Sequence, residues 1–210
     1  MRARAFSGAA VLTQLFALSV LLLPAAVPPV VAAKGQIENI ESPTVGDENI
    51  DGKNFTVSRV LVHAKPEQIW HVLTDYHNAP RVFPQLKKCE LVQDKGATKI
   101  LKHQVNPSGL PACSTYTYTV EVKESYAKSL EWHRVSGDFK AVDGFWKLEP
   151  LNNGHDTLVT YSNYVSGGFF IPQMLIKRQC RVDMPNVLSN LKSESEGIKI
   201  AKRSDTSSTQ

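Results

Sequence analysis

The sequence predicts an α+β domain in which a curved antiparallel sheet wraps around a long C-terminal helix. Three observations support it: a strand-like run followed by a short helix, a series of strand-like segments separated by turn signals, and a long amphipathic segment at the end. Short turns favour a meander, and an amphipathic helix can cover one of its faces. The 210 residues are 42% apolar and 21% charged, which suits one globular domain with extensions.

The N-terminus has a composition of its own. Arg2 and Arg4 precede an uncharged run over residues 5–33, and small residues stand just before Lys34. This pattern is typical of a signal peptide at 1–33, so we expect export to a periplasm or to the exterior. An uncleaved membrane anchor is the alternative, because about 20 apolar residues can cross a bilayer. Three prolines behind the leucines disfavour that continuous helix.

Two polar segments frame the domain. Residues 34–54 contain little apolar spacing and are interpreted as a polar linker, and residues 198–210 as a flexible tail. The domain is therefore placed at 55–197. Without Arg2 and Arg4, 22 basic residues stand against 20 acidic ones, so the remaining chain is nearly neutral. Nucleic acid is thus not expected as a partner, because phosphate binding needs a concentrated basic stripe.

The three cysteines, Cys89, Cys113 and Cys180, allow one disulfide and one remaining thiol in an exported chain. The sequence does not choose among the three possible pairs. Cys89 and Cys113 would both begin strands, which makes them the preferred pair if a bridge forms. Three buried free thiols are the alternative.

The domain is expected to begin with a strand at 55–63. A short helix should follow, beginning at Pro66 and ending near Asp75. A second helical turn is expected at 79–83. The predicted strands then run over 87–93, 98–105, 114–122, 129–135, 139–149 and 157–166. Strict alternation places Tyr116, Tyr118 and Val120 on one face of their strand.

The last helix is expected over 172–197. Its apolar residues recur at three- and four-residue steps and form one stripe: Met174, Leu175, Cys180, Met184, Val187, Leu188 and Leu191. Pro185 lies inside this helix and removes one backbone hydrogen bond. A kink, or a break near Asp183, is therefore expected.

Four short motifs, in order, resemble the START-type polyketide cyclase/dehydrase family of the SRPBCC superfamily, which includes the coenzyme Q-binding START-domain proteins. The motifs are 69–76, Phe83-Pro84, 144–150 and 157–161. The resemblance covers roughly 55–197 and implies a helix-grip fold with a hydrophobic tunnel. Members bind lipids, quinones, hormones or polyketides, and a minority catalyse. The export signal departs from the intracellular members and argues against a ribosomal partner.

Catalytic signatures are sparse. Of the six histidines, only His71 and His77 are close in sequence, with Asp75 between them, and His77 lies beyond the expected helix end. No metal site, no cofactor and no catalytic residue is therefore predicted. A cyclase or dehydrase would need a proton-transfer group in the tunnel. The candidates for it are Tyr116, Tyr118, Tyr161, Arg134, Asp143 and His133.

Binding makes looser demands: an apolar lining with a few polar groups. The predicted ligand-binding residues are Tyr116, Tyr118, Val120, Trp132, Arg134, Trp146, Leu148, Tyr161, Met174 and Met184, although each could also be an ordinary core residue. Phe169, Phe170 and Ile171 are the predicted gate or membrane contact, with a hydrophobic staple as the alternative.

The function predicted from these residues is an exported, non-enzymatic binding protein. It would hold a hydrophobic small molecule, a lipid or isoprenoid quinone, between sheet and helix, with transient membrane contact as a further possibility. A polyketide or aromatic cyclase-dehydrase and a protein-interaction domain with a filled core are the alternatives.

Overall fold

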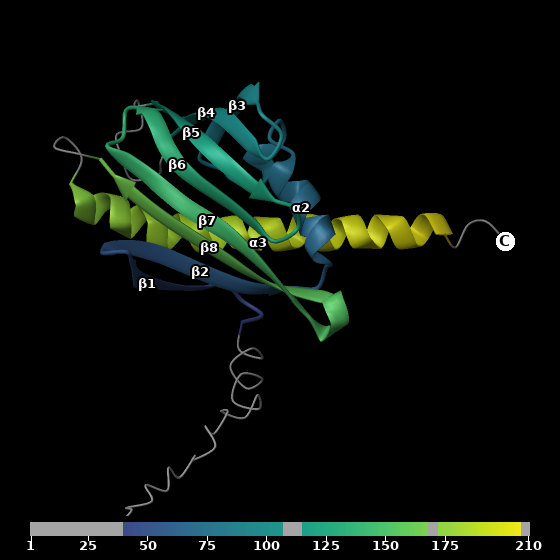
Figure 1. The fold of residues 1–210 in the computed structure, drawn as a ribbon. Coiled ribbons are helices and arrows are strands. Elements are labelled where there is room, and N and C mark those ends of the chain that lie inside the picture. The colour runs from purple at the N-terminus through teal and green to yellow at the C-terminus, as the bar shows by residue number, and fades with distance from the viewer. Residues whose placement is uncertain (1–39, 107–114, 168–171, 207–210) are drawn as a thin grey trace, which may run out of the picture.

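The computed structural model describes residues 40–106, 115–167 and 172–206. It contains one curved, unclosed, eight-stranded antiparallel sheet and a long C-terminal helix, so the predicted helix-grip fold is confirmed (Figure 1). The elements in chain order are β1 (Thr44–Ile50), β2 (Lys53–Val62), α2 (Pro66–Thr74), η1 (Ala79–Arg81), β3 (Leu86–Asp94), β4 (Thr98–Val105), β5 (Tyr116–Ser125), β6 (Ser129–Gly137), β7 (Ala141–Leu151), η2 (Asn152–Gly154), β8 (Asp156–Ser166) and α3 (Gln173–Thr206).

The sheet order is β1-β2-β8-β7-β6-β5-β4-β3, with every neighbouring pair antiparallel. Strands β3 to β8 form the predicted meander, in which each strand pairs with the next in sequence. The first two strands then join at the far side, where β2 pairs with β8. The segment after β2 carries α2 and η1 to the opposite edge, where β3 begins the meander.

Helix α2 begins where its sequence favours a helix start. Pro66 is the first helical residue, and the backbone N–H of Lys65 donates to Oε1 of Gln68 at 3.2 Å. Ile69, Trp70 and Leu73 are buried, as the helical spacing predicts.

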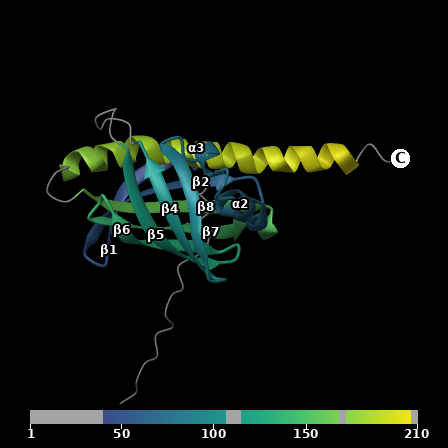
Figure 2. The ribbon, with the colours of Figure 1, turned by 90° about the horizontal axis from the view of Figure 1, so that it is seen from above.

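Helix α3 lies across the sheet and packs against β2, β8 and α2 (Figure 2). Four of its side chains are at most 3% exposed and form part of the main core: Met184, Val187, Leu188 and Leu191. The C-terminal part of α3 extends beyond the sheet (Figures 1 and 2). Removal of these apolar side chains from water is the main interaction that holds helix and sheet together.

Helix α3 continues without a break through Pro185, so of the predicted kink or break near Asp183 the break is wrong, and the kink stays a prediction. Side chains in the neighbouring turns add hydrogen bonds to main-chain carbonyls: Nδ2 of Asn186 donates to the Val182 oxygen at 3.1 Å, and the Ser189 hydroxyl donates to the Pro185 oxygen at 3.0 Å. The buried stripe on both sides of Pro185 fixes the helix against the sheet. The helix also extends to Thr206, past the expected domain end at residue 197.

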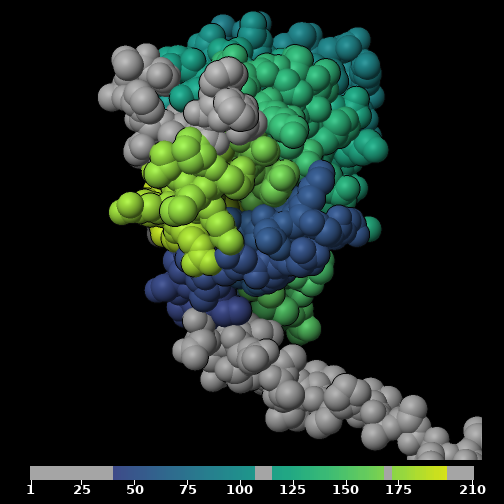
Figure 3. Space-filling view, turned by 90° about the vertical axis from the view of Figure 1, so that its left-hand side faces the viewer, coloured from purple at the N-terminus to yellow at the C-terminus, as the bar shows by residue number. Residues whose placement is uncertain are grey.

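Strand β1 forms inside the segment that was expected to be a linker. It pairs with β2 along its whole length, and ion pairs fix it to the start of α3: Oδ2 of Asp47 lies 2.8 Å from Nζ of Lys177 and 2.5 Å from Nη2 of Arg181. The first part of α3 and the strands β1 and β2 lie side by side on one face of the molecule (Figure 3). Residues 1–33, the expected signal peptide, lie outside the described residues.

Within the described ranges, no helix combines the length and the apolar character needed to cross a membrane.

Candidate functional site

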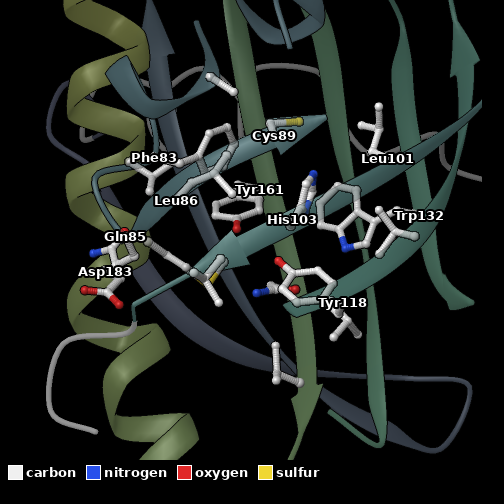
Figure 4. Close-up of a pocket in the computed structure, with 18 of the residues that line it drawn as sticks. Phe83, Gln85, Leu86, Cys89, Leu101, His103, Tyr118, Trp132, Tyr161 and Asp183 are labelled. Atoms are coloured by element: carbon white, nitrogen blue, oxygen red, sulfur yellow. The ribbon is translucent and has the colours of Figure 1, made fainter. Parts of the chain in front are cut away.

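A cavity of about 230 Å³ lies between α3 and the face of the sheet that α3 covers, with α2 and η1 at one side (Figure 4). Strands β3 to β8 all contribute lining residues. For comparison, a cavity of about 150 Å³ is large enough to bind benzene in a protein core. The cavity therefore has room for a ring system larger than benzene.

Aromatic side chains form much of the wall. The rings of Trp146 and Tyr161, a directly opposed pair on β7 and β8, are stacked with centroids 4.1 Å apart and an interplanar angle of 7°. Phe83 meets both rings edge-on at 6.1 and 6.3 Å, and Trp132 lies 6.1 Å from Tyr161. Packed aromatic surfaces of this kind are rigid and suit a planar ligand.

Gly144 makes room for this wall. In the sheet register it lies between Trp132 on β6 and Asn163 on β8, and both of these neighbours line the cavity. A Cβ atom on Gly144 would come within 2.3 Å of Cζ2 of Trp132 and 2.3 Å of the Ser162 carbonyl oxygen. Trp132 therefore occupies space that any side chain at position 144 would fill.

Three polar residues of the lining, His103, Tyr118 and Tyr161, carry no charge at neutral pH. Burial lowers the pKa of His103 to about 4, so its imidazole is neutral at pH 7, and its ring meets that of Tyr118 edge-on at 5.1 Å. Burial also raises the pKa of Tyr118 and Tyr161 above the ordinary tyrosine value. Both phenols thus carry their proton across the physiological range.

The two thiols of the lining are also protonated. Burial raises the pKa of Cys89 to about 12 and that of Cys180 to about 11, so neither is a nucleophile at neutral pH. Cys89, a candidate for a bridge with Cys113 in the sequence, carries a free thiol, and so does Cys180. Cys113 lies outside the described residues.

Asp183 on α3 is the one carboxylate in the described lining. Burial raises its pKa, while hydrogen bonds from Gln179 and Gln85 lower it; the Gln179 amide lies 2.8 Å from Oδ1. Figure 4 shows Asp183 next to Gln85 at the α3 side of the cavity.

A second hollow, of about 380 Å³, adjoins the cavity between α3 and strands β2 and β8. The two spaces share four lining residues: Asn163, Val165, Ile176 and Cys180. Lys53 and Lys177 belong to the second hollow alone. Each is paired with a carboxylate: Lys53 with Asp143 at 2.7 Å and Lys177 with Asp47 at 2.8 Å.

Six of the ten residues predicted to bind a ligand line the cavity: Tyr118, Val120, Trp132, Trp146, Tyr161 and Met184. The structure places the other four elsewhere. Tyr116 stacks on Phe139, and Leu148 lies in the core. Arg134 donates from Nη2 to the Gly137 oxygen at 2.7 Å, while Met174, in the first turn of α3, is 81% exposed. Ligand contact by any of the ten stays a prediction.

The candidate proton-transfer residues, the two neighbouring histidines and the predicted gate lie in different places. Of the candidate proton-transfer residues, Asp143 pairs with Lys53 and His133 lies on the surface near Glu121, so both are outside the cavity. His71 and His77 are exposed, and the described part of the chain holds no cluster of three metal-ligating side chains. The predicted gate, Phe169, Phe170 and Ile171, lies outside the described residues.

Sequence reasoning missed several polar lining residues: Gln85, Cys89, His103, Asn163, Gln179 and Asp183. A signal existed for His103, since alternation along β4 places it on the same face as Leu101 and Val105, which also line the cavity. Asp183 lies four residues after Gln179 and so shares its helix face. Asn163 carried the same signal as His103, because it lies two residues after Tyr161 on β8 and so shares its face.

His103 gives a testable pH dependence. Because its pKa is about 4 in the folded protein and about 6.5 in an unfolded chain, only the unfolded chain takes up this proton between those values. The stability that depends on the neutral ring is complete above pH 6.5 and is lost as the pH falls toward 4. Between pH 7 and pH 5, we expect the free energy of unfolding to fall by about 2 kcal/mol more in the wild type than in His103→Phe.

Urea unfolding at both pH values measures this difference. His63 titrates in the same range with the opposite sign, because its hydrogen bond to Asp156 raises its pKa. That residue is present in both proteins, so its contribution cancels. Equal pH dependence in the two proteins would contradict a neutral, partly buried His103.

The fold and cavity together define a helix-grip protein with an internal, largely apolar pocket. Residues 62–192 match the family model described as "polyketide cyclase / dehydrase and lipid transport", and the chain belongs to this family. The resemblance found in the sequence is thereby confirmed. No curated protein sequence gives a significant match.

Solved structures with the same fold come from several kinds of protein. Human StAR-related lipid transfer protein 5 superposes with a TM-score of 0.62 at 12% identity, covering 75% of this chain and 84% of that one. A STAR-related lipid transfer protein from Xanthomonas axonopodis gives 0.61 at 20%, covering 74% and 94%. The Zhui aromatase/cyclase from Streptomyces sp. R1128 gives 0.57 at 16%, covering 68% and 93%. At these identities the similarity establishes the fold alone.

Proposed function

We propose that this protein binds a hydrophobic small molecule, a lipid or an isoprenoid quinone, in the cavity and does not transform it. The observation that supports this most directly is the 230 Å³ space with a stacked aromatic wall beneath α3. Each CH₂ group that leaves water for such a space contributes about 0.8 kcal/mol, so binding needs no dedicated catalytic motif. The lipid transfer proteins among the structural relatives support the same function.

The protonation states of His103, Cys89 and Cys180 favour binding over acid–base catalysis by these three groups. A general acid or base works best with a pKa near the working pH. The pKa of His103 lies near 4, and those of Cys89 and Cys180 lie near 12 and 11. None of these groups exchanges a proton readily at pH 7. An open cavity also disfavours an interaction domain with a filled core.

A cyclase or dehydrase activity is the second candidate, and one observation favours it. His103 and Tyr118 meet inside the cavity, so two polar side chains converge on one space. An aromatase/cyclase is among the structural relatives. In that case His103→Phe would abolish turnover while the ligand stays bound.

The N-terminal pattern of Arg2, Arg4 and the apolar run over 5–33 supports export as part of the proposal. The binding site would then act in a periplasm or outside the cell, with a lipid or quinone obtained from a membrane.

The proposal is tested by native mass spectrometry of the full chain, purified gently from its own host, with solvent extraction of the bound species. We expect a hydrophobic molecule at close to one per chain. Val120→Phe adds a ring to a buried lining position and should lower this occupancy at least tenfold.

The matched control is Val92→Phe, at an exposed position on β3, which should keep full occupancy. Circular dichroism would show whether both variants keep the fold. A wild-type protein that is repeatedly empty would overturn the proposal, and a bound molecule that Val120→Phe does not displace would place the ligand outside the cavity.

A further inference from the structure

We propose, building on the binding function above, that the cavity selects an uncharged ligand bearing a hydroxyl or carbonyl group and rejects acidic lipids such as fatty acids and phosphate esters.

The described lining contains no lysine and no arginine. A carboxylate or phosphate bound there would meet no opposite charge, and a buried unpaired anion costs several kcal/mol. The one carboxylate in the described lining, Asp183, would repel it further. The charge inventory therefore opposes an acidic ligand.

Lysines on neighbouring elements do not compensate for this. Lys53 and Lys177 line the adjoining hollow, not the cavity, and each has a carboxylate within 2.8 Å. On β4, Lys99 is paired with Asp94 at 2.6 Å. Tyr76, an uncharged lining residue, donates its hydroxyl to Glu124 at 2.5 Å. An acid that drew on Lys53, Lys177 or Lys99 would have to break one of these ion pairs, while Arg134 lies outside the lining and donates to the Gly137 oxygen.

Uncharged hydrogen-bonding groups, in contrast, are available. The hydroxyls of Tyr118 and Tyr161 make no hydrogen bond to any other residue that the structure describes, and both residues line the cavity. Oδ1 of Asn163 is buried and, among the described residues, has no partner. We call Tyr118, Tyr161 and Asn163 the neutral patch.

The neutral patch comes from two parts of the sheet. Tyr161 and Asn163 lie two residues apart on β8, so they share its cavity-facing side, and Tyr118 reaches the same cavity from β5. Figure 4 shows Tyr118, Tyr161 and Trp132 projecting into this space. A ligand oxygen that pairs with the patch gains hydrogen bonds to groups that no described residue engages, and for the buried Asn163 oxygen an unmade bond is costly.

The patch also matches the chemistry of an uncharged oxygen. A tyrosine hydroxyl donates to a carbonyl, and the Asn163 oxygen accepts from a hydroxyl. The stacked rings of Trp146 and Tyr161 offer a flat surface for a ring that carries such a group. The ligand class that fits is thus a ring system with a hydroxyl or carbonyl substituent and no charge.

Three probes with one skeleton test this: 2-naphthylmethanol, 2-naphthoate and 2-naphthylmethylamine, which at pH 7.4 are neutral, anionic and cationic. Isothermal titration calorimetry on the full chain measures each affinity. We expect the alcohol to bind at least tenfold tighter than either charged probe. Tyr118→Phe, Tyr161→Phe and Asn163→Leu should each weaken the alcohol three- to tenfold, with little effect on the others.

Tyr126→Phe is the matched control, because Tyr126 is 63% exposed and outside the lining, and it should leave all three affinities unchanged. Naphthoate binding as tightly as the alcohol overturns charge selection but leaves the binding function intact. Tighter binding of the amine overturns it as well and assigns the site to a cation held by Asp183. Failure of all three probes to bind overturns the inference, and an empty extracted protein would then overturn the proposed function too.

Discussion

Replacing Gly144 with alanine is expected to lower the free energy of unfolding by about 3 kcal/mol or more, near the upper end of the cost of overpacking a core. The new Cβ would lie 2.3 Å from the Ser162 carbonyl oxygen, which is backbone of the paired strand and has no rotamer to adopt. It would also meet Trp132 at 2.3 Å, in the cavity wall. Urea unfolding measures the loss.

Gly46→Ala is the matched control. Gly46 lies in edge strand β1, where an added Cβ meets nothing within 4 Å, so its effect should stay within about 0.5 kcal/mol. If Gly144→Ala were as mild as this control, Trp132 would not be held against position 144. In Gly144→Ala, the new Cβ should displace Trp132 and shift its fluorescence emission, because the indole would move in the cavity.

The role of Gly144 shows where sequence reasoning reaches its limit. The motif around Gly144 was readable as a strand, and it helped to establish the family resemblance. Its position between Trp132 and Asn163 depends on the register of three strands, which is set by long-range pairing. A single strand pattern does not contain that information.

Local signals predicted the elements well. Alternation and turn residues gave the six strands of the meander to within a few residues, and Pro66 marked the start of α2. These features depend on neighbours in sequence, which explains the success. β1 was missed for the opposite reason: it is an edge strand, largely exposed, and its polar residues need no apolar alternation when β2 supplies the pairing.

The candidate site was predictable where its residues come from the alternation of single strands. Tyr118, Trp132, Trp146 and Tyr161 follow from alternation along their strands, and all four line the cavity. Of the polar residues, Asn163 also follows from alternation along β8, whereas Asp183 reaches the cavity only through the packing of α3 on the sheet. Met174 also shows that helix packing decides which residues reach the cavity. It fits the apolar stripe in sequence, yet it lies in the first turn of α3 and is exposed.

Replacing Leu188 with alanine is expected to cost about 3 kcal/mol of stability, within the 2–5 kcal/mol typical of a large-to-small change in a core. Leu188 is fully buried three residues beyond Pro185, where the helix depends on side-chain packing because proline has removed a main-chain hydrogen bond. Thermal and urea unfolding measure the loss. Leu175→Ala, on the same helix but 44% exposed, is the matched control and should cost less than about 1 kcal/mol. Equal losses would mean that the buried apolar stripe of α3 does not hold this helix against the sheet. Another interaction would then have to keep α3 over the cavity.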